Sequence, residues 1–549
     1  MGDMMQFPLL TSHIIRNAAS RYSNTQVVSK LEDGSVHKYS YKDAYTRIKQ
    51  LANALTKLGV KQGDCIATIA LNNFRHFELY YGISGIGAIV HTVNARLFSQ
   101  QIHYILQHAQ DKFIFIDASL VPLIEKIIQQ LPCVKGIIIN CSLQDMPNTS
   151  LKNVHCYETL IGEQSDEYNW PSLAAHTPCC LCYTSGTTGH PKGVLYSHQS
   201  TVMHAMMSGS SQLLDFNQDS VVMPMVPMYH VVAWGIPFSA PLYGAKLVLP
   251  GPILDGESVH QLIHNERVNK AYGVPEVWLG LHQYLQQSGK RIPSLLNIGV
   301  GGAASPEALV KTYWEEYGVY WMGIWGMTET SPLVTAAIHE PAMDNMKPNA
   351  RYRIQASAGR AIFGCEIAIF DHDQTALPHD GITQGQLKVR GPWIMSHYFK
   401  EKPPKKSKHS WFDTGDTATI DSQGYLRIVD RHKDVIKSGD NWISSVQLED
   451  AALNYQPVDE ACVISAKHTL WNERPIMLVT LKNRQQFNKG QFMKVLKSHL
   501  SNWCLPDAII TVPSLPHTGT GKLKKYELRQ QYQNYLLNSA LCTQDEYTP

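Results

Sequence analysis

A loop of small, hydroxyl-bearing residues lies between two apolar runs and is suited to holding a phosphate chain. Residues 183–192 read YTSGTTGHPK, after the apolar residues 179–183 and before the strand-like residues 193–196. Small side chains let backbone N–H groups approach an anion, the hydroxyls add donors, and Lys192 adds positive charge. The composition therefore indicates a triphosphate-binding loop.

Two other interpretations apply to this loop. A P-loop NTPase needs Gly directly before Lys and Ser or Thr directly after it, whereas here Lys192 precedes Gly193 and Val194 follows. The P-loop pattern is therefore not met. An ordinary Gly/Thr turn between strands remains an alternative for the loop taken alone.

Four further segments carry residues suited to nucleotide chemistry. They are GGAAS at 301–305, WGMTET at 325–330, WFDTGD at 411–416 with DRHKDVIK at 430–437, and TGTGK at 518–522. In this order, and together with the loop at 183–193, they resemble the signature motifs of the adenylate-forming enzymes. That group comprises acyl-CoA synthetases, peptide-synthetase adenylation domains and firefly luciferase, and the resemblance spans essentially the whole chain.

The resemblance implies a reaction in two halves that uses ATP, Mg²⁺ and coenzyme A. A carboxylate attacks the α-phosphate of ATP to give an acyl-adenylate and pyrophosphate, and the thiol of coenzyme A then attacks the acyl carbonyl. The first half joins two anions, so positive charge must be held where negative charge accumulates. Lys522 is expected to bridge the α-phosphate and the carboxylate, and Lys192 to hold the β- and γ-phosphates.

The resemblance also implies metal and nucleotide ligands. Mg²⁺ prefers oxygen ligands and keeps several waters, and Thr184 and Glu329 are the expected protein ligands. Trp325 is expected to lie against adenine, while Asp416 and Arg431 are expected at the ribose. The implied catalytic residues are Lys522, Glu329, Lys192 and Thr328, and the implied nucleotide-binding residues are Thr184, Ser185, Gly186, Thr187, Thr188, Gly189, Lys192, Gly302, Ala303, Ala304, Trp325, Gly326, Thr328, Asp416, Arg431 and Lys437.

Each of these residues taken singly has an ordinary structural interpretation. Glu329 suits the start of a helix, Trp325 a core aromatic and Asp416 a turn. Lys522 taken alone suits simple surface charge. The order of the motifs along one chain is what favours the catalytic interpretation.

An apolar segment at 227–235, PMYHVVAWG, resembles the branch of the family that activates medium- to long-chain fatty acids. Residues 244–252 and 438–445 carry the same resemblance. His230 and Trp234 are expected to line or gate the acyl tunnel, with Gly235 allowing close approach, although a lone His among apolar residues is commonly a satisfied core residue. The expected acyl-pocket residues are His230, Val231, Trp234, Gly301 and Ile324.

The family rotates a small domain between the two half-reactions, and its hinge maps onto residues 430–434. Asp430 and Lys433 are the expected hinge residues, with Lys433 as the pivot. In one orientation Lys522 enters the site, and in the other the loop 437–442 helps to form the pantetheine channel. The expected coenzyme A loop consists of Ser438, Gly439, Asp440, Asn441 and Trp442.

The sequence departs from the family pattern at two places. Residues 439–441 read GDN where the family usually has Gly-Gly-Glu, so a charged Asp440 replaces glycine and the amide of Asn441 replaces a carboxylate. Asp adopts positive φ more readily than most residues, but its charge is expected to repel the phosphates of coenzyme A. Gly323 and Ile324 stand where many relatives have a polar and then a small residue, which is expected to reshape the end of the acyl pocket.

Alternating helices and strands are expected to position these residues, because the apolar pattern switches repeatedly between the two types over residues 40–330. Predicted strands predominate from about residue 350, and a compact region of roughly 100 residues follows residue 434. The expected helices are 41–58 and 77–93; the expected strands are 65–70, 113–116, 221–225, 246–249, 298–300, 365–370, 385–389 and 425–429; the last region alternates over 446–453, 460–466, 475–481 and 489–500.

The predicted fold class is therefore α/β, with a large N-terminal domain of two α/β subdomains plus a β-rich subdomain and a small mobile C-terminal α+β domain. A chain of 549 residues exceeds the roughly 250–300 residues over which one core keeps growing. The predicted boundaries are 1–429 for the large domain, 430–434 for the hinge, 435–535 for the small domain and 536–549 for a tail.

Bulk composition excludes several classes of protein. A net charge of +2, from 48 basic and 46 acidic residues, gives no global field for nucleic acid. Eleven irregularly spaced cysteines and no secretory leader favour thiols in the cytoplasm. Residues 79–93 are too short for a spanning helix of ~20 residues and are expected to form a buried helix. A homodimer and a weak peripheral membrane contact stay open.

Three cysteines at 179, 180 and 182 raise the alternative of a metal site. Strand geometry puts only Cys180 and Cys182 on one face, and neither a CxxC pair nor a His at ligand spacing follows. Core thiols are the favoured interpretation.

The sequence predicts a fatty acid–CoA ligase of the AMP-forming type. The enzymatic alternative is an adenylate-forming enzyme that uses another acid or passes the acyl group to another acceptor, such as a carrier protein. The non-enzymatic alternative is a nucleotide-binding homologue with impaired turnover.

Overall fold

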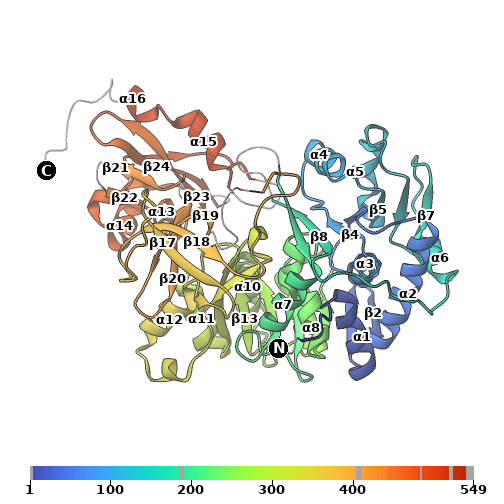
Figure 1. Ribbon diagram of the computed structural model, residues 1–549. Coiled ribbons are helices and arrows are strands. Elements are labelled where there is room, and N and C mark those ends of the chain that lie inside the picture. Colours follow the sequence, from blue (N-terminus) through green and yellow to red (C-terminus); the bar gives the residue numbers. More distant parts are fainter. Residues whose placement is uncertain are drawn as a thin grey trace. The chain divides into compact units, whose positions relative to one another are not determined.

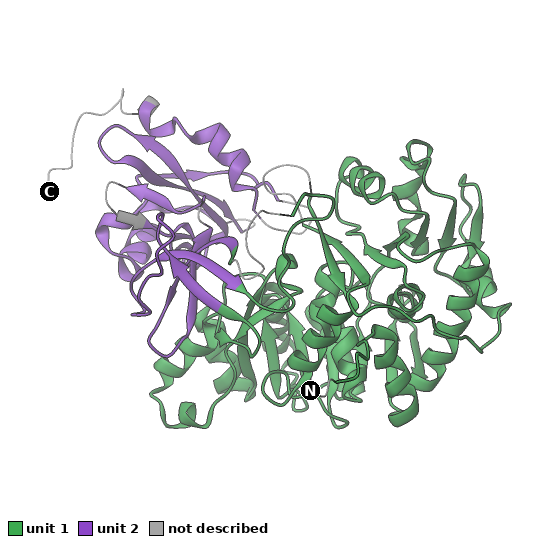
Figure 2. Cartoon of the chain, viewed as in Figure 1, with its two compact units in different colours: residues 1–184, 190–366, 390–412 green, residues 185–189, 367–389, 413–549 purple. Residues whose placement is uncertain are grey.

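The computed structural model describes residues 4–184, 191–403, 411–431, 433–438, 441–482, 485–517 and 523–539 (Figure 1). The chain divides into two compact units (Figure 2). Unit 1 comprises residues 1–184, 190–366 and 390–412, and unit 2 comprises residues 185–189, 367–389 and 413–549. The domain boundaries at 429 and 434 remain predictions.

A seven-stranded sheet forms the first half of unit 1. Its strands are parallel except for the hairpin that β8 makes with β9. Runs such as FIFI in β5 and GIII in β6 are buried along their whole length, as expected of parallel strands covered on both faces. The strand order is β7 (Val154–Cys156), β6 (Gly136–Ile139), β5 (Phe113–Ile116), β3 (Cys65–Ile69), β4 (Ile89–Thr92), β8 (Pro178–Tyr183) and β9 (Gly193–Ser197).

A nine-stranded sheet forms the other half of unit 1. Six strands, from β14 to β1, are parallel, and antiparallel strands close one edge at β15 and the other at β2. One face packs on a core that includes Trp278, Tyr313 and Trp321. The strand order is β16 (Arg360–Ala361), β15 (Leu333–Ala336), β14 (Tyr320–Gly326), β13 (Asn297–Val300), β12 (Lys270–Gly273), β10 (Val221–Pro224), β11 (Lys246–Leu249), β1 (Gln26–Lys30) and β2 (Val36–Ser40).

Helices connect the strands of both sheets (Figure 1). Several start at side-chain caps; Ser40, for example, accepts from the Asp43 N–H in a reciprocal capping box. The helices of unit 1 are α1 (Thr11–Arg21), α2 (Tyr41–Lys57), α3 (Phe74–Gly85), α4 (Ser99–Ala109), α5 (Val121–Glu125), α6 (Tyr157–Gly162), α7 (His198–Gly209), α8 (Ile236–Leu242), α9 (Gly256–Glu266), α10 (Pro275–Ser288), α11 (Glu307–Tyr317) and α12 (Pro348–Ala356).

The prediction of one helix over residues 77–93 is wrong. Helix α3 ends at Gly85, and residues 89–92 form β4 in the middle of the seven-stranded sheet. Gly87 lies between them with a φ of +86°, a conformation that ends the helix and that glycine adopts without strain. An unbroken apolar run does not distinguish a buried helix from a buried strand, which is why periodicity missed this boundary.

Unit 2 contains most of a four-stranded sheet and all of a five-stranded sheet. The first has the order β17 (Glu366–Phe370), β18 (Gly385–Arg390), β19 (Phe412–Ile420) and β20 (Leu426–Arg431). The second contains β21 (Ile436–Ser438), β22 (Asn441–Ile443), β23 (Val458–His468), β24 (Asn472–Leu481) and β25 (Ala508–Thr511). The helices are α13 (Ser445–Leu453), α14 (Lys489–His499), α15 (Lys525–Tyr532) and α16 (Tyr535–Ser539). The predicted α/β fold class is confirmed.

The three neighbouring cysteines that were expected to be core thiols are buried. Cys179, Cys180 and Cys182 are buried free thiols on β8, and the Sγ of Cys179 lies 3.3 Å from the Thr201 hydroxyl.

Within the described part of the chain, no helix is both long and apolar enough to cross a bilayer.

Candidate active site

The predicted phosphate loop is held at its base by the β8–β9 hairpin of unit 1. The Thr184 N–H donates to the Lys192 carbonyl (2.9 Å), and the Lys192 N–H donates to the Thr184 hydroxyl (3.2 Å). The predicted residues Ser185, Gly186, Thr187, Thr188 and Gly189 lie outside the described residues. Because β8 runs parallel to β4, the hairpin carries its loop to the carboxyl edge of the sheet, where ligands bind in folds of this kind.

Lys192 is positioned by an aromatic ring as well as by the hairpin. Its Nζ lies 4.5 Å from the centre of the Tyr398 ring and 3.7 Å from the carboxylate of Glu401. Its side chain is 54% exposed, so both contacts are weak ones that an incoming phosphate can replace. Phe399, the next residue after Tyr398, donates from its N–H to the Gly193 carbonyl (2.8 Å) and fixes this segment against β9.

Glu329 lies in the short 3₁₀ turn η5 (Thr328–Thr330), which follows β14. The Tyr398 hydroxyl donates to Glu329 Oε1 (2.9 Å), and the Met395 N–H donates to the Glu329 carbonyl (2.9 Å). The neighbouring Thr328 accepts at its carbonyl from the Tyr196 hydroxyl (2.7 Å). One phenol therefore connects Glu329 with Lys192, although the two lie 137 positions apart in the sequence.

Tyr398 is a site residue that sequence reasoning missed. It lies in the run SHYFK, which has no phosphate-loop or metal-ligand spacing. The available signal was weak: two aromatic residues stand directly before a dense run of charge. Only the fold brings its ring to Lys192 and its hydroxyl to Glu329.

The residues present fit a magnesium ion by their chemistry. Thr184 supplies a hydroxyl oxygen and Glu329 a carboxylate that is buried to 6% exposure, and Mg²⁺ takes oxygen ligands of these kinds beside phosphates and waters. Both belong to unit 1 and are connected through Lys192 and Tyr398. Groups of three or more His, Cys, Asp or Glu suited to a metal are absent from the described residues.

Several predicted nucleotide-binding residues lie near the ends of two neighbouring parallel strands. Gly302, Ala303 and Ala304 lie just beyond β13, which ends at Val300, and Trp325 lies near the end of β14, which pairs with β13. A Cβ on Gly326 would lie 1.9 Å from the Pro332 carbonyl oxygen, so only glycine fits there. Strands that end at the same edge bring these segments together at a common crevice.

Three of the predicted acyl-pocket residues meet in the structure. A Cβ on Gly301 would lie 2.6 Å from the Ile324 carbonyl oxygen and 3.3 Å from the ring of Trp234. Gly301 is therefore the residue that lets this ring approach the backbone of the sheet. His230 and Val231 belong to the same segment as Trp234, since His230 directly precedes the turn η4 (Val231–Gly235).

The turn η4 has an unusual backbone. Four successive non-glycine residues, from Val231 to Trp234, have φ between +44° and +57°. A left-handed conformation costs roughly 1–2 kcal/mol for each L-residue, so the surroundings must hold this turn in place. Its residues are buried, and α8 follows it directly.

His204 is a second residue that sequence reasoning missed. It lies on α7 at 1% exposure, and burial lowers its pKa to about 3, so the imidazole is neutral. Its Nε2 accepts from the Leu333 N–H (3.2 Å), which places the proton on Nδ1. A Cβ on Gly235 would lie 2.8 Å from Nδ1, so Gly235 accommodates this ring. His204 thus connects η4 with the strand that follows Glu329.

In unit 2 the two predicted ribose residues are partners. Asp416 on β19 pairs with Arg431 on β20, and its Oδ1 lies 3.0 Å from the Arg431 Nε. The Asp416 side chain is 5% exposed, whereas that of Arg431 is 43% exposed. Arg431 also donates to the Thr414 carbonyl (3.1 Å), and the Asp416 N–H donates to the Thr414 hydroxyl (3.1 Å). A nearly buried carboxylate is therefore held beside an accessible cation.

The predicted hinge and coenzyme A loop are described in part. Asp430 is buried, at 2% exposure. The Lys433 carbonyl accepts a hydrogen bond from Arg529. Lys437 is exposed on β21, and Ser438 beside it is buried and accepts from Arg474 (3.2 Å). Asn441 and Trp442 lie on β22, which pairs with β21, while Gly439, Asp440 and Lys522 lie outside the described residues.

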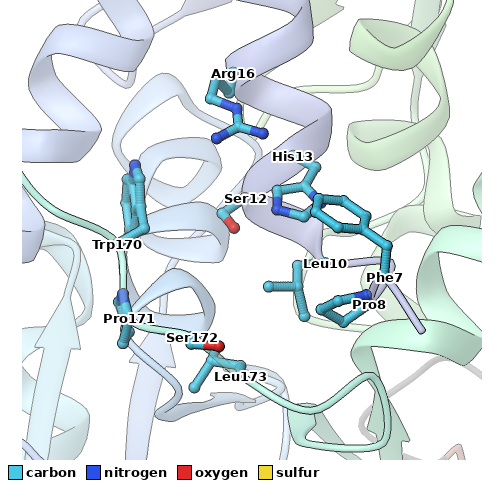
Figure 3. Close-up of a pocket in the computed structure, with 10 residues that line it drawn as sticks. All are labelled: Phe7, Pro8, Leu10, Ser12, His13, Arg16, Trp170, Pro171, Ser172 and Leu173. Carbon is cyan, nitrogen blue, oxygen red and sulfur yellow. The ribbon is translucent and has the colours of Figure 1, made fainter. Parts of the chain in front are cut away.

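A separate pocket of about 280 Å³ lies at the start of unit 1 and contains none of the predicted site residues. In Figure 3 the ring of Trp170 lies on one side and the stacked rings of Phe7 and His13 on the other, with the Arg16 guanidinium pointing between them. The lining residues are Phe7, Pro8, Leu10, Ser12, His13, Arg16, Trp170, Pro171, Ser172 and Leu173.

Comparison with known proteins gives full-length matches. The family model described as AMP-binding enzyme matches residues 15–399, and the AMP-binding enzyme C-terminal domain matches residues 447–522. The chain is 41% identical over 540 residues to the medium-chain-fatty-acid–CoA ligase of Ectopseudomonas oleovorans, covering 98% of this chain and 99% of that protein. It is 38% identical to the long-chain-fatty-acid–CoA ligase of Thermus thermophilus, covering 97% of each.

Solved structures share the fold. The anthranilate CoA ligase AuaEII in complex with anthranoyl-AMP superposes with a TM-score of 0.83 at 23% identity, covering 98% of this chain and 100% of that one. The o-succinylbenzoate CoA synthetase of Bacillus subtilis in complex with ATP and magnesium gives a TM-score of 0.78 at 22% identity, covering 94% and 99%.

Proposed function

This chain belongs to the AMP-binding enzyme family and is an ATP-dependent, AMP-forming acyl-CoA ligase that uses Mg²⁺ and coenzyme A, and we propose that its acid is a medium- to long-chain fatty acid. The observation that carries the proposal is identity of about 40% along the whole chain to ligases named for such acids. The position of the buried Trp234 ring close to Gly301 supports it, because an acyl chain needs an apolar wall.

We propose that unit 1 prepares the phosphates for the first half-reaction. Lys192 balances the charge of the β- and γ-phosphates, and Thr328 helps to hold the nucleotide. Thr184 and Glu329 would hold the magnesium ion, which supplies charge neutralisation at the phosphates. The acid's oxygen forms a bond to the α-phosphorus, the bond from that phosphorus to the leaving oxygen breaks, and pyrophosphate departs.

We propose that unit 2 supplies the ribose contacts and presents a different loop to the site in each half-reaction. Asp416 accepts from the ribose hydroxyls while Arg431 orients it. Lys522 bridges the α-phosphate and the acid in the first half-reaction. After rotation at Lys433, the coenzyme A loop guides the thiol to the acyl carbonyl, where a thioester bond forms and AMP departs.

The test is a chain-length series of fatty acids incubated with pure protein, ATP, Mg²⁺ and coenzyme A. AMP and acyl-CoA should form in equal amounts, with the highest kcat/KM for medium to long chains. Adenylate without thioester, or thioester only with a carrier protein, would favour the alternative acceptor. Absence of pyrophosphate exchange with every acid, while ATP still binds, would favour a homologue without turnover.

Compartment and assembly are also proposals. The ten free cysteines among the described residues support a reducing compartment, which we take to be the cytoplasm. Size-exclusion chromatography with light scattering tests the proposed homodimer, and vesicle flotation tests a peripheral membrane contact.

A further inference from the structure

A buried hydrogen-bond network joins three segments of unit 2. Lys525, the first residue of α15, donates from its Nζ to the Ser445 hydroxyl (2.6 Å). Ser445, the first residue of α13, donates from its hydroxyl (2.5 Å) and from its N–H (2.8 Å) to Asp430 Oδ2. Asp430 lies near the end of β20, so the network runs from the start of α15 to the predicted hinge.

A carboxylate completes the network. Glu449 Oε1 lies 2.8 Å from Lys525 Nζ and also accepts from the Val463 N–H (2.6 Å). The side chains of Lys525 and Glu449 are only 12% and 14% exposed. Charges so far removed from water must be paired, and breaking such a pair leaves an uncompensated charge.

The position of Lys525 is otherwise unfavourable for a cation. Burial lowers its pKa, but Glu449 and Asp430 oppose this effect and raise the pKa overall. The ammonium also lies at the N-terminus of a helix, where the macrodipole disfavours positive charge. Local helix chemistry therefore does not account for this lysine, and its specific partners do.

The same helix begins directly after the segment that carries Lys522. Residues 518–522 lie outside the described residues, but the flanking His517 and Leu523 pair in an antiparallel bridge. The Lys524 N–H donates to the Pro516 carbonyl (2.8 Å). Both ends of this segment therefore meet at the start of α15.

One turn further along, α15 contacts the predicted hinge again. Arg529 donates to the Lys433 carbonyl and pairs with the Asp434 carboxylate. The helix is thus joined to residues 430–434 at two points, once through Lys525 and Ser445 and once through Arg529.

We propose that Lys525 is a positioning residue for adenylate formation: its ammonium fixes the start of α15, which follows Lys522 by three residues in the sequence, against Asp430 through Ser445. The inference rests on the proposed role of Lys522. A misplacement of about 1 Å can cost about 100-fold in rate, so a residue that never touches the substrate can still govern kcat.

The test is Lys525→Met, measured in the two half-reactions separately. We expect kcat for pyrophosphate exchange to fall about 10- to 100-fold, with the KM values for ATP and acid within about twofold. Conversion of supplied acyl-adenylate to thioester should stay within about threefold. Lys525→Arg, which keeps the charge, should recover part of the exchange rate.

Lys524→Met is the matched control. Lys524 is the neighbouring residue, and its Nζ lies 2.9 Å from the carboxylate of Glu527 within the same helical segment. We expect its exchange rate to match that of the unaltered protein. An equal loss in Lys524→Met and Lys525→Met would overturn the proposal.

A double variant separates positioning from folding. Lys525→Met leaves Glu449 buried without its cation, whereas Lys525→Met with Glu449→Gln removes both charges and should recover thermal stability. Exchange should remain low in the double variant. Recovery of exchange together with stability would reduce Lys525 to a structural role.

Lys522→Ala, assayed in parallel, distinguishes an error in the proposed role of Lys522 from an error in the positioning role of Lys525. If Lys522→Ala keeps full exchange, the proposed role of Lys522 is wrong. If Lys522→Ala loses exchange while Lys525→Met keeps it, only the positioning role of Lys525 is overturned.

Discussion

At the scale of single residues, the site depends on side chains that hold other side chains. Tyr398 contacts Lys192 with its ring and Glu329 with its hydroxyl, and His204 connects Gly235 with Leu333. None of these contacts is local in sequence. Sequence motifs identify the residues that are predicted to contact a ligand. The fold identifies the residues that hold these predicted residues in position.

Tyr398→Phe should lower adenylate formation while leaving the fold intact. The variant keeps the ring beneath Lys192 but removes a hydrogen bond to a buried carboxylate, a type of bond worth about 1.5–3 kcal/mol. We expect kcat/KM for Mg-ATP in pyrophosphate exchange to fall about 10- to 100-fold. Tyr168→Phe, which removes an exposed hydroxyl near Thr56, is the control. Unchanged exchange in Tyr398→Phe would contradict the role.

Glu449 should make unit 2 less stable as pH rises. Burial raises the pKa of this carboxyl from its ordinary 4.5 to about 7, although Lys525 acts in the opposite direction. The folded protein then binds the proton more tightly than the unfolded chain, so the free energy of unfolding should fall by about 3 kcal/mol between pH 4.5 and pH 7. Denaturation across this range should show a flatter pH dependence in Glu449→Gln, and an identical slope would refute the assignment.

At the scale of elements, sequence patterns predicted most strands and helices but not where one type changes to the other. The strand over 113–116 and the helix starting at Tyr41 match the structure, because a short apolar run defines the strand and a capping box defines the start of the helix. The run 77–93 failed since both α3 and β4 are buried on all sides. The left-handed turn η4 had no sequence signal either, because Val and Ala do not favour positive φ.

Gly235→Ala should disturb η4. The new methyl would meet the His204 ring, and the φ of +75° is strained for alanine, so we expect about 2–4 kcal/mol of destabilisation and a raised KM for the acid. Gly34→Ala is the matched control, because Gly34 has a φ of +84° with no atom within 4 Å of the added Cβ. Chemical denaturation should show a smaller loss in the control. Equal losses would mean that crowding against His204 contributes nothing.

At the scale of the whole molecule, the predicted site residues are divided between the two units. Unit 1 contains Lys192, Glu329 and the predicted acyl residues, and unit 2 contains the ribose pair and the start of α15. The ordered motifs made the family and the reaction predictable from sequence. The network around Lys525 was not predictable from sequence, since its members come from β20, α13 and α15. These residues contact one another only when the three elements pack together.

Lys522→Ala should separate the two halves of the reaction. By its proposed role, Lys522 stabilises charge in the first half only, so adenylate formation should fall at least about 100-fold. Supplied acyl-adenylate should still be converted to thioester at near the original rate. Equal loss in both half-reactions would contradict the alternation of loops between them.

The phenol shared by Lys192 and Glu329 has a thermodynamic consequence. Drawing the ammonium toward a phosphate, or the carboxylate toward a cation, perturbs the same ring. Occupancy at one group therefore changes affinity at the other, and linkage requires the effect to be equal in both directions. On the proposed roles of Lys192 and Glu329, ATP and magnesium would bind as interdependent ligands, with Tyr398 carrying the coupling free energy between them.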